Sequence, residues 1–118
     1  MGSKPRFVVG IGASAGGLEA IRALIRSIPP NTGMAFVVVQ HLSPDFKSLM
    51  DELLGKETSM PVVIPESETP IEANHIYLNR RDMTLVCEGS NLVFEKKKER
   101  YTLPIDIFLH TLGEAYQE

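Results

Sequence analysis

The chain begins with two continuous apolar runs that are separated by an amphipathic segment. Phe7–Ile11 and Met34–Val39 show no polar alternation, which is typical of parallel strands covered on both faces. Leu18–Ile28 instead carries apolar residues three or four positions apart with charged residues between them, and this pattern predicts a helix. Strand, helix and strand in this order predict a βαβ unit with a right-handed crossover.

Beyond the second strand the apolar segments become shorter. They predict a helix at Phe46–Glu57, strands at Pro61–Ile64, His75–Leu78, Met83–Cys87 and Leu92–Phe94, and a helix from Thr102 to the end of the chain. The turn residues Glu88–Asn91 are expected to join the last two strands into an antiparallel hairpin. The charge run Glu95–Arg100 is expected to form a solvated loop after that hairpin.

The order of these elements predicts an α/β fold. We expect a doubly wound, Rossmann-like parallel sheet with an inserted antiparallel hairpin, formed by one domain that spans residues 1–118. Because the chain ends on a predicted helix, the sheet is expected to be incomplete at its C-terminal end.

Composition limits the classes of protein that the chain can represent. Its formal net charge of −3 argues against general binding to nucleic acid or to anionic membranes. Cys87 is the single cysteine, so an internal disulfide and a cysteine-based zinc site are excluded, and a reducing cytoplasmic setting is expected. The longest apolar run, Met34–Val39, is too short to span a bilayer. We expect neither a metal nor another cofactor.

A serine surrounded by small residues lies between the first predicted strand and the first predicted helix. Gly12-Ala13-Ser14-Ala15-Gly16 fits G-x-S-x-G, the spacing of a nucleophile elbow, in which a serine stands at a sharp turn above a sheet. Ser14 is therefore a candidate nucleophile. In the alternative interpretation it is a helix cap or part of a phosphate-binding loop.

His41 follows the second predicted strand as Ser14 follows the first. If these parallel strands are neighbours about 4.8 Å apart, their carboxyl ends share one edge of the sheet. Ser14 and His41 would then be within hydrogen-bonding reach, as a nucleophile and its general base require. The first backbone N–H groups of the predicted helix point at the same edge and could hold an oxyanion. Taken alone, His41 would more simply be a surface or capping residue.

The sequence shows no acid that clearly orients His41. Asp45 resembles a helix cap, and Asp51, Asp82 and Asp106 have no evident route to this edge of the sheet. A dinucleotide site is a weaker alternative for the glycine-rich stretch. Gly10-x-Gly12-x-x-Ala15 fits G-x-G-x-x-A, but Gln40 stands near the end of the second strand where that fingerprint places an acidic residue.

Four stretches together resemble the catalytic domain of the CheB chemotaxis methylesterases. Gly10–Gly17 is similar to the serine loop of that family and Gln40–Pro44 to its histidine loop. Asn74–Leu78 and Leu103–Phe108 are similar to its hairpin entry and to the helix that follows. The sequence around His41 is most similar to methylesterase domains fused to methyltransferase domains.

The resemblance implies hydrolysis of glutamate γ-methyl esters on methylated chemoreceptor proteins, with release of methanol, and also suggests deamidation of glutamine. Ser14 would be the nucleophile, His41 its general base, and the backbone N–H near Ala15 part of the oxyanion hole. Methyltransferase or receiver domains are expected partners within the parent protein. A receptor-binding or regulatory module without activity is the main alternative.

One motif of the family is not found in the chain. The resemblance places the triad aspartate in a G-x-G-x-D-G loop beyond the last predicted helix, and no such loop occurs in these 118 residues. The chain is therefore expected to be about the first two-thirds of the catalytic domain, nearly inactive by itself and prone to self-association through its unfinished sheet.

Overall fold

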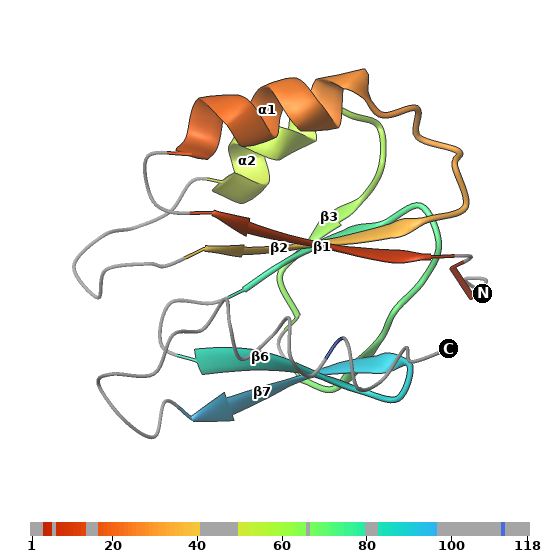
Figure 1. Ribbon diagram of the computed structural model, residues 1–118, viewed down its shortest axis with the longest axis vertical. Helices are drawn as coiled ribbons and strands as arrows, with labels where there is room; N and C mark the ends of the chain where they lie inside the picture. Colours follow the sequence, from red (N-terminus) through yellow and green to blue (C-terminus); the bar gives the residue numbers. More distant parts are fainter. Residues whose placement is uncertain are drawn as a thin grey trace.

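The computed structural model describes residues 4–5, 7–13, 17–40, 50–65, 67–79, 83–96 and 112. Within these ranges the elements are β1 (Val8–Ala13), α1 (Leu18–Ser27), β2 (Ala35–Gln40), α2 (Met50–Gly55), β3 (Val62–Val63), β4 (Thr69–Pro70), β5 (Ile76–Leu78), β6 (Met83–Glu88) and β7 (Asn91–Lys96). They form three layers: the two helices, a parallel sheet and a small antiparallel sheet (Figure 1).

The parallel sheet has the strand order β1-β2-β5-β3. The first two strands pair over their full length, from Val8 opposite Ala35 to Ala13 opposite Gln40. All six residues of β2 are buried, which explains why its sequence is continuously apolar up to Gln40. The predicted βαβ unit is thereby confirmed. The position of β5 between β2 and β3 could not be read from the order of the elements.

Both helices pack on one face of this sheet, where α1 and α2 lie side by side in Figure 1. The shared core consists of Ile21, Ile25, Phe36, Val38, Met50, Leu54, Met60, Ile76 and Leu78. Phe36 and Val38 alternate along β2 with residues that face the opposite side, as the period of two in a strand requires. The apolar stripe of α1 therefore covers alternate residues of the central strand.

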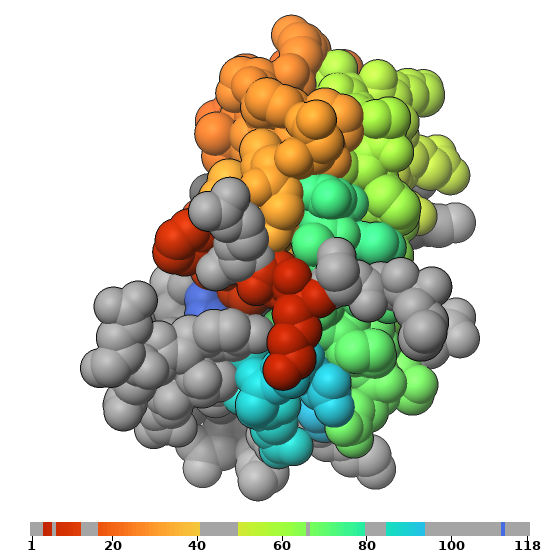
Figure 2. Space-filling view, turned by 90° about the vertical axis from the view of Figure 1, so that its right-hand side faces the viewer, coloured from red at the N-terminus to blue at the C-terminus, as the bar shows by residue number. Residues whose placement is uncertain are grey.

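The opposite face of the parallel sheet is covered by the antiparallel sheet β4-β7-β6. Its core consists of Ala35, Val37, Val39, Ile71, Tyr77, Leu85, Cys87 and Leu92, and the helical residue Leu112 packs against it. In Figure 2 the orange and yellow-green helices form one end of the molecule, the cyan hairpin the other, and the red N-terminal segment lies between them. The expected α/β fold with an antiparallel hairpin is confirmed.

Three details differ from the pattern in the sequence or extend it. Thr69–Pro70, which reads as a proline-marked break, forms a short edge strand against β7, a position in which proline costs no ladder hydrogen bond. The hairpin strand runs to Lys96, so the charge run starts inside β7 rather than in a loop, because Glu95 and Lys96 still pair with Thr84 and Met83 of β6. The start of the helix predicted from Phe46 and, apart from Leu112, the C-terminal helix lie outside the described residues.

Candidate active site

The residues assigned to catalysis from the sequence, Ser14, Ala15 and His41, lie outside the described residues. The structure describes the frame to which they are attached. Ala13 is the last residue of β1, Gln40 is the last residue of β2, and the two are direct partners in the parallel ladder. Their strands point the same way and end at one edge of the sheet, where α1 also begins (Figure 1).

α1 begins at this edge, and the first N–H groups of a helix have no acceptor within the helix itself. The N-cap residue is Gly17, which has no side chain to accept a hydrogen bond from the first N–H groups of the helix. The helix is held by its buried residues Ile21 and Ile25, so the direction of these donors is fixed by packing against the sheet. A helix N-terminus also carries a partial positive charge, which favours an anion at this position.

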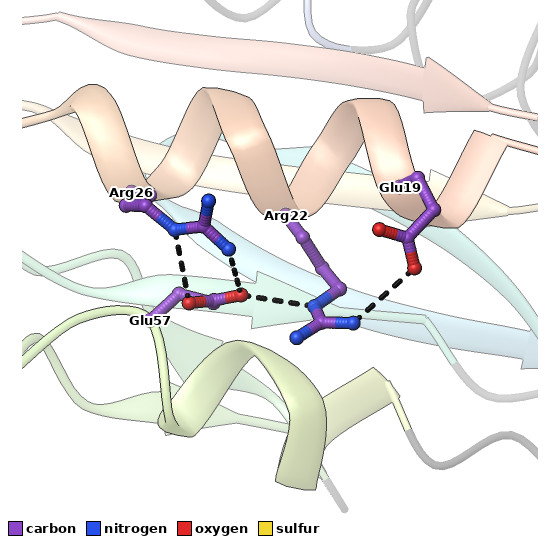
Figure 3. Close-up of polar contacts among 4 residues, drawn as sticks. All are labelled: Glu19, Arg22, Arg26 and Glu57. Atoms are coloured by element: carbon purple, nitrogen blue, oxygen red, sulfur yellow. Dashed lines mark hydrogen bonds and ion pairs between the residues drawn. The ribbon is translucent and has the colours of Figure 1, made fainter.

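A cluster of charged side chains ties α1 to the turn that follows α2 (Figure 3). The guanidinium of Arg22 donates from Nε to Oε2 of Glu57 at 2.9 Å, and that of Arg26 donates from Nη2 to the same oxygen at 2.9 Å. Arg26 Nε also donates to Oε1 of Glu57 at 3.2 Å, which makes this pair bidentate. Glu19 accepts from Arg22 at 3.2 Å one helical turn away.

This cluster changes the protonation equilibrium of Glu57. The hydrogen bonds from Arg26, and then the hydrogen bond from Arg22, hold the pKa of the Glu57 carboxyl below its ordinary value, because they stabilise the ionised form. The same carboxylate raises the pKa of Arg26. The cluster thus connects α1 with the turn after α2, through Arg22 in the middle of the helix and Arg26 in its last turn.

The carboxyl end of β2 is fixed by a side chain that sequence reasoning missed. The carboxamide of Asn79, the residue after β5, accepts from the backbone N–H of Gln40 at 3.0 Å and donates to the backbone C=O of Gln40 at 2.9 Å. Both residues are buried. An asparagine directly after an apolar strand was the signal available in the sequence, but its partner lies 39 residues earlier.

A comparison with known protein families identifies the family of this chain. The model of the family described as CheB methylesterase matches residues 9–118, which is nearly the whole chain. The chain belongs to the CheB methylesterase family. The resemblance seen in the sequence is thereby confirmed, and with it the assignment to a family of carboxylic ester hydrolases.

Named CheB relatives show how much of such a protein the chain represents. A protein-glutamate methylesterase/protein-glutamine glutaminase of Mesorhizobium japonicum is 41% identical over 113 residues, covering 93% of this chain and 33% of the relative. The corresponding Pseudomonas aeruginosa protein is 29% identical over 119 residues, covering 98% of this chain and 35% of its own length. The chain therefore spans about a third of the length of these relatives.

A solved CheB structure shows the same fold. The crystal structure of the Thermotoga maritima CheB methylesterase catalytic domain superposes with a TM-score of 0.77 at 24% sequence identity, covering 98% of this chain and 64% of that one. The three-layer arrangement described above is thus the fold of a CheB catalytic domain.

His75 is the histidine within the described ranges, and it lies away from the carboxyl end of β2. His75 precedes β5 and therefore lies at the edge of the sheet opposite to Asn79. Its Nδ1 donates to the carbonyl of Ala73 at 2.8 Å, its Nε2 lies 3.3 Å from a carboxylate oxygen of Glu72, and its ring stacks on Tyr77. These contacts connect His75 with the segment before β5 and with Tyr77, and none of the three is with the carboxyl end of β2.

Cys87 is a residue of β6 and packs in the core between the two sheets. Its thiol donates to the carbonyl of Gly89 at 3.6 Å. Burial raises the pKa of this thiol to about 11, so it is protonated at neutral pH.

The dinucleotide alternative meets a difficulty in the position of its glycines. Gly10 and Gly12 both lie inside β1 and pair with Val37 and Val39 of β2. The fingerprint instead places its glycines at the tight turn after the strand and at the start of the helix.

Of the four aspartates considered as partners for His41, only Asp51 is described, and it lies in the first turn of α2. Asp45, Asp82 and Asp106 lie outside the described residues.

Within the described ranges, no three His, Cys, Asp or Glu side chains gather in a group that could hold a metal ion. The helices described are too short or too polar to cross a membrane.

Proposed function

We propose that the chain carries the serine and histidine of an esterase that hydrolyses glutamate γ-methyl esters on chemoreceptor proteins and releases methanol. The observation that supports this most strongly is the pairing of Ala13 with Gln40. The next residues in the chain are Ser14 and His41. Neighbouring strands are about 4.8 Å apart and successive Cα atoms about 3.8 Å apart, so chain continuity keeps both residues near one edge of the sheet.

In the proposed reaction His41 accepts the proton of the Ser14 hydroxyl while its oxygen attacks the ester carbonyl carbon. The resulting oxyanion is stabilised by backbone N–H groups at the start of α1 and near Ala15. The carbonyl re-forms, the C–O bond to the methoxy group breaks, and His41 returns its proton to the departing methanol. Water then hydrolyses the acyl-enzyme by the same steps and regenerates Ser14. The carboxamide of glutamine, with ammonia as its leaving group, is proposed as a second substrate.

The activity is proposed for the full-length protein that contains these 118 residues. The acid that orients the histidine of a triad contributes about 10⁴-fold to kcat in a serine protease, and the G-x-G-x-D-G loop expected to supply it does not occur in this sequence. We therefore propose that the 118 residues tested alone release methanol at only a small fraction of the full-length rate.

The test measures methanol release from a methyl-esterified receptor by the full-length protein and by its Ser14→Ala and His41→Gln variants. Each variant is expected to lose about 10³-fold or more of kcat. The matched controls are Ser27→Ala and His75→Gln, which remove a serine and a histidine outside the proposed site and are expected to keep full activity.

The proposal is rejected if the folded wild-type protein releases no methanol, or if Ser14→Ala retains its rate. Binding of the receptor by a wild-type protein that lacks esterase activity would instead identify a receptor-binding module.

A further inference from the structure

The side chain of Asn79 acts as one more peptide group of the parallel sheet. β5 ends at Leu78, which pairs with Val38, so the backbone ladder stops before it reaches Gln40. The Asn79 carboxamide continues it, because its oxygen accepts from the Gln40 N–H at 3.0 Å and its nitrogen donates to the Gln40 C=O at 2.9 Å. A backbone N–H must donate and a carbonyl must accept, so these two partners fix which way the carboxamide is turned.

These two hydrogen bonds hold a segment that has neighbours on both sides. Gln40 pairs with Ala13 of β1 on one side and with the Asn79 carboxamide on the other. Gln40 is 6% exposed and Asn79 7% exposed, so water has little access to replace either bond. The last residue of β2 therefore has a partner on each side, as the residues in the middle of the strand do.

The Gln40 carbonyl belongs to the peptide group that joins Gln40 to His41. A hydrogen bond to that oxygen restricts the rotation of this peptide group. We propose that Asn79 is a positioning residue for His41: it sets the orientation from which the imidazole reaches the serine. This inference rests on the function proposed above and assigns Asn79 no contact with the substrate.

The experiment compares Asn79→Ala, which removes both hydrogen bonds, with Asn79→Asp in the full-length protein. At neutral pH the aspartate keeps an acceptor for the Gln40 N–H but has no hydrogen to donate to the Gln40 carbonyl. The matched control is Asn74→Gly. It removes another asparagine carboxamide that accepts from a backbone N–H, that of Gly33 at 2.8 Å, but at the opposite edge of the sheet. Glycine tolerates the backbone angle φ of 62° that Asn74 adopts.

The kinetic readout is kcat per folded molecule, with the folded fraction measured under the assay conditions. A displaced catalytic group lowers the rate steeply, by about 10²-fold for 1 Å. We therefore expect both Asn79 variants to lower kcat about tenfold or more, with KM within about twofold of the wild type. Asn74→Gly is expected to keep kcat per folded molecule within about twofold, even if fewer molecules are folded.

A second readout needs no catalysis. The ring signals of His41 and His75 are compared at one pH by nuclear magnetic resonance, together with hydrogen exchange of the Gln40 amide. In Asn79→Ala the His41 signal is expected to move and the Gln40 amide to exchange at least about tenfold faster, whereas the His75 signal stays in place. Asn74→Gly is expected to leave the His41 signal and the Gln40 amide unchanged.

The two readouts separate failure of this inference from failure of the proposed function. Absence of Ser14-dependent methanol release in the wild type overturns the esterase proposal, and with it the positioning role in that reaction. An active wild type whose Asn79→Ala variant keeps kcat per folded molecule overturns the positioning role alone. An unchanged His41 signal in Asn79→Ala overturns it as well.

Discussion

The hydroxyl of Tyr77 links the two sheets, and its removal should weaken the whole fold. Tyr77 is a residue of β5 in the parallel sheet and is 1% exposed. Its hydroxyl accepts from the backbone N–H of Glu72 at 2.9 Å and donates to the carbonyl of Pro70, in β4, at 3.3 Å. Tyr77→Phe removes both hydrogen bonds and leaves the ring to pack as before.

The magnitude follows from these two bonds. Each contributes about 1 kcal/mol net to the free energy of unfolding, so Tyr77→Phe should lower that free energy by about 2 kcal/mol. This corresponds to an increase of about 30-fold in the unfolding equilibrium constant. For a domain of this size the melting temperature should fall by roughly 6–10 °C.

The pH dependence gives a second signature of the same hydroxyl. Burial raises the pKa of Tyr77 above its ordinary value of 10.0, although the hydrogen bond from the Glu72 amide opposes this shift. A group whose pKa is raised in the folded state stabilises that state fully below its unfolded pKa and loses this contribution as the pH rises through its folded pKa. The stability difference between wild type and Tyr77→Phe should therefore be constant at neutral pH and shrink above about pH 10.

The assay is urea unfolding followed by circular dichroism at pH 7 and at alkaline pH. Ser27→Ala is the matched control, because its exposed hydroxyl donates to Leu24 within the same helix at 2.7 Å and joins no second element. It should change the free energy of unfolding by less than about 0.5 kcal/mol. A Tyr77→Phe effect no larger than that of Ser27→Ala, or one that is equally large at alkaline pH, would refute this account of the sheet contact.

Two further predictions concern groups whose pKa is shifted. Glu57→Gln should destabilise the domain at neutral pH. Because the folded-state pKa of Glu57 lies below its ordinary value of 4.5, the difference in stability from wild type should vanish as the pH falls through that lowered pKa. Urea unfolding at a series of acid pH values measures this difference, and a difference that does not change with pH contradicts the prediction. The thiol of Cys87 has a pKa of about 11, so at pH 8 it should react with iodoacetamide much more slowly in the folded domain than in urea. Equal reaction rates in the folded and the urea-unfolded protein would show that the thiol is accessible.

Several features of this protein are determined locally and were therefore readable from the sequence. The continuous apolar run before Gln40 encodes a strand buried on both faces, and the spacing in Leu18–Ile28 encodes a helix with one apolar side. A periodicity of two or of three to four residues follows from the geometry of each element alone. The strand order of β1 and β2 also follows, because a short right-handed crossover brings consecutive parallel strands together. The motif stretches were specific enough by themselves to indicate the CheB family.

Other features depend on which elements meet in space, and no local pattern encodes them. β5 enters the sheet between β2 and β3, although β3 comes directly after β2 among the strands along the chain. Glu57 meets Arg26 across 31 residues, and Asn79 meets Gln40 across 39 residues. The last two contacts are polar pairings at the end or surface of an element, where many partners are chemically equivalent. The sequence alone thus determined the elements and the family, whereas the tertiary structure decided the contacts that hold α1 and the end of β2, because only the packed sheet selects one partner among the equivalent ones.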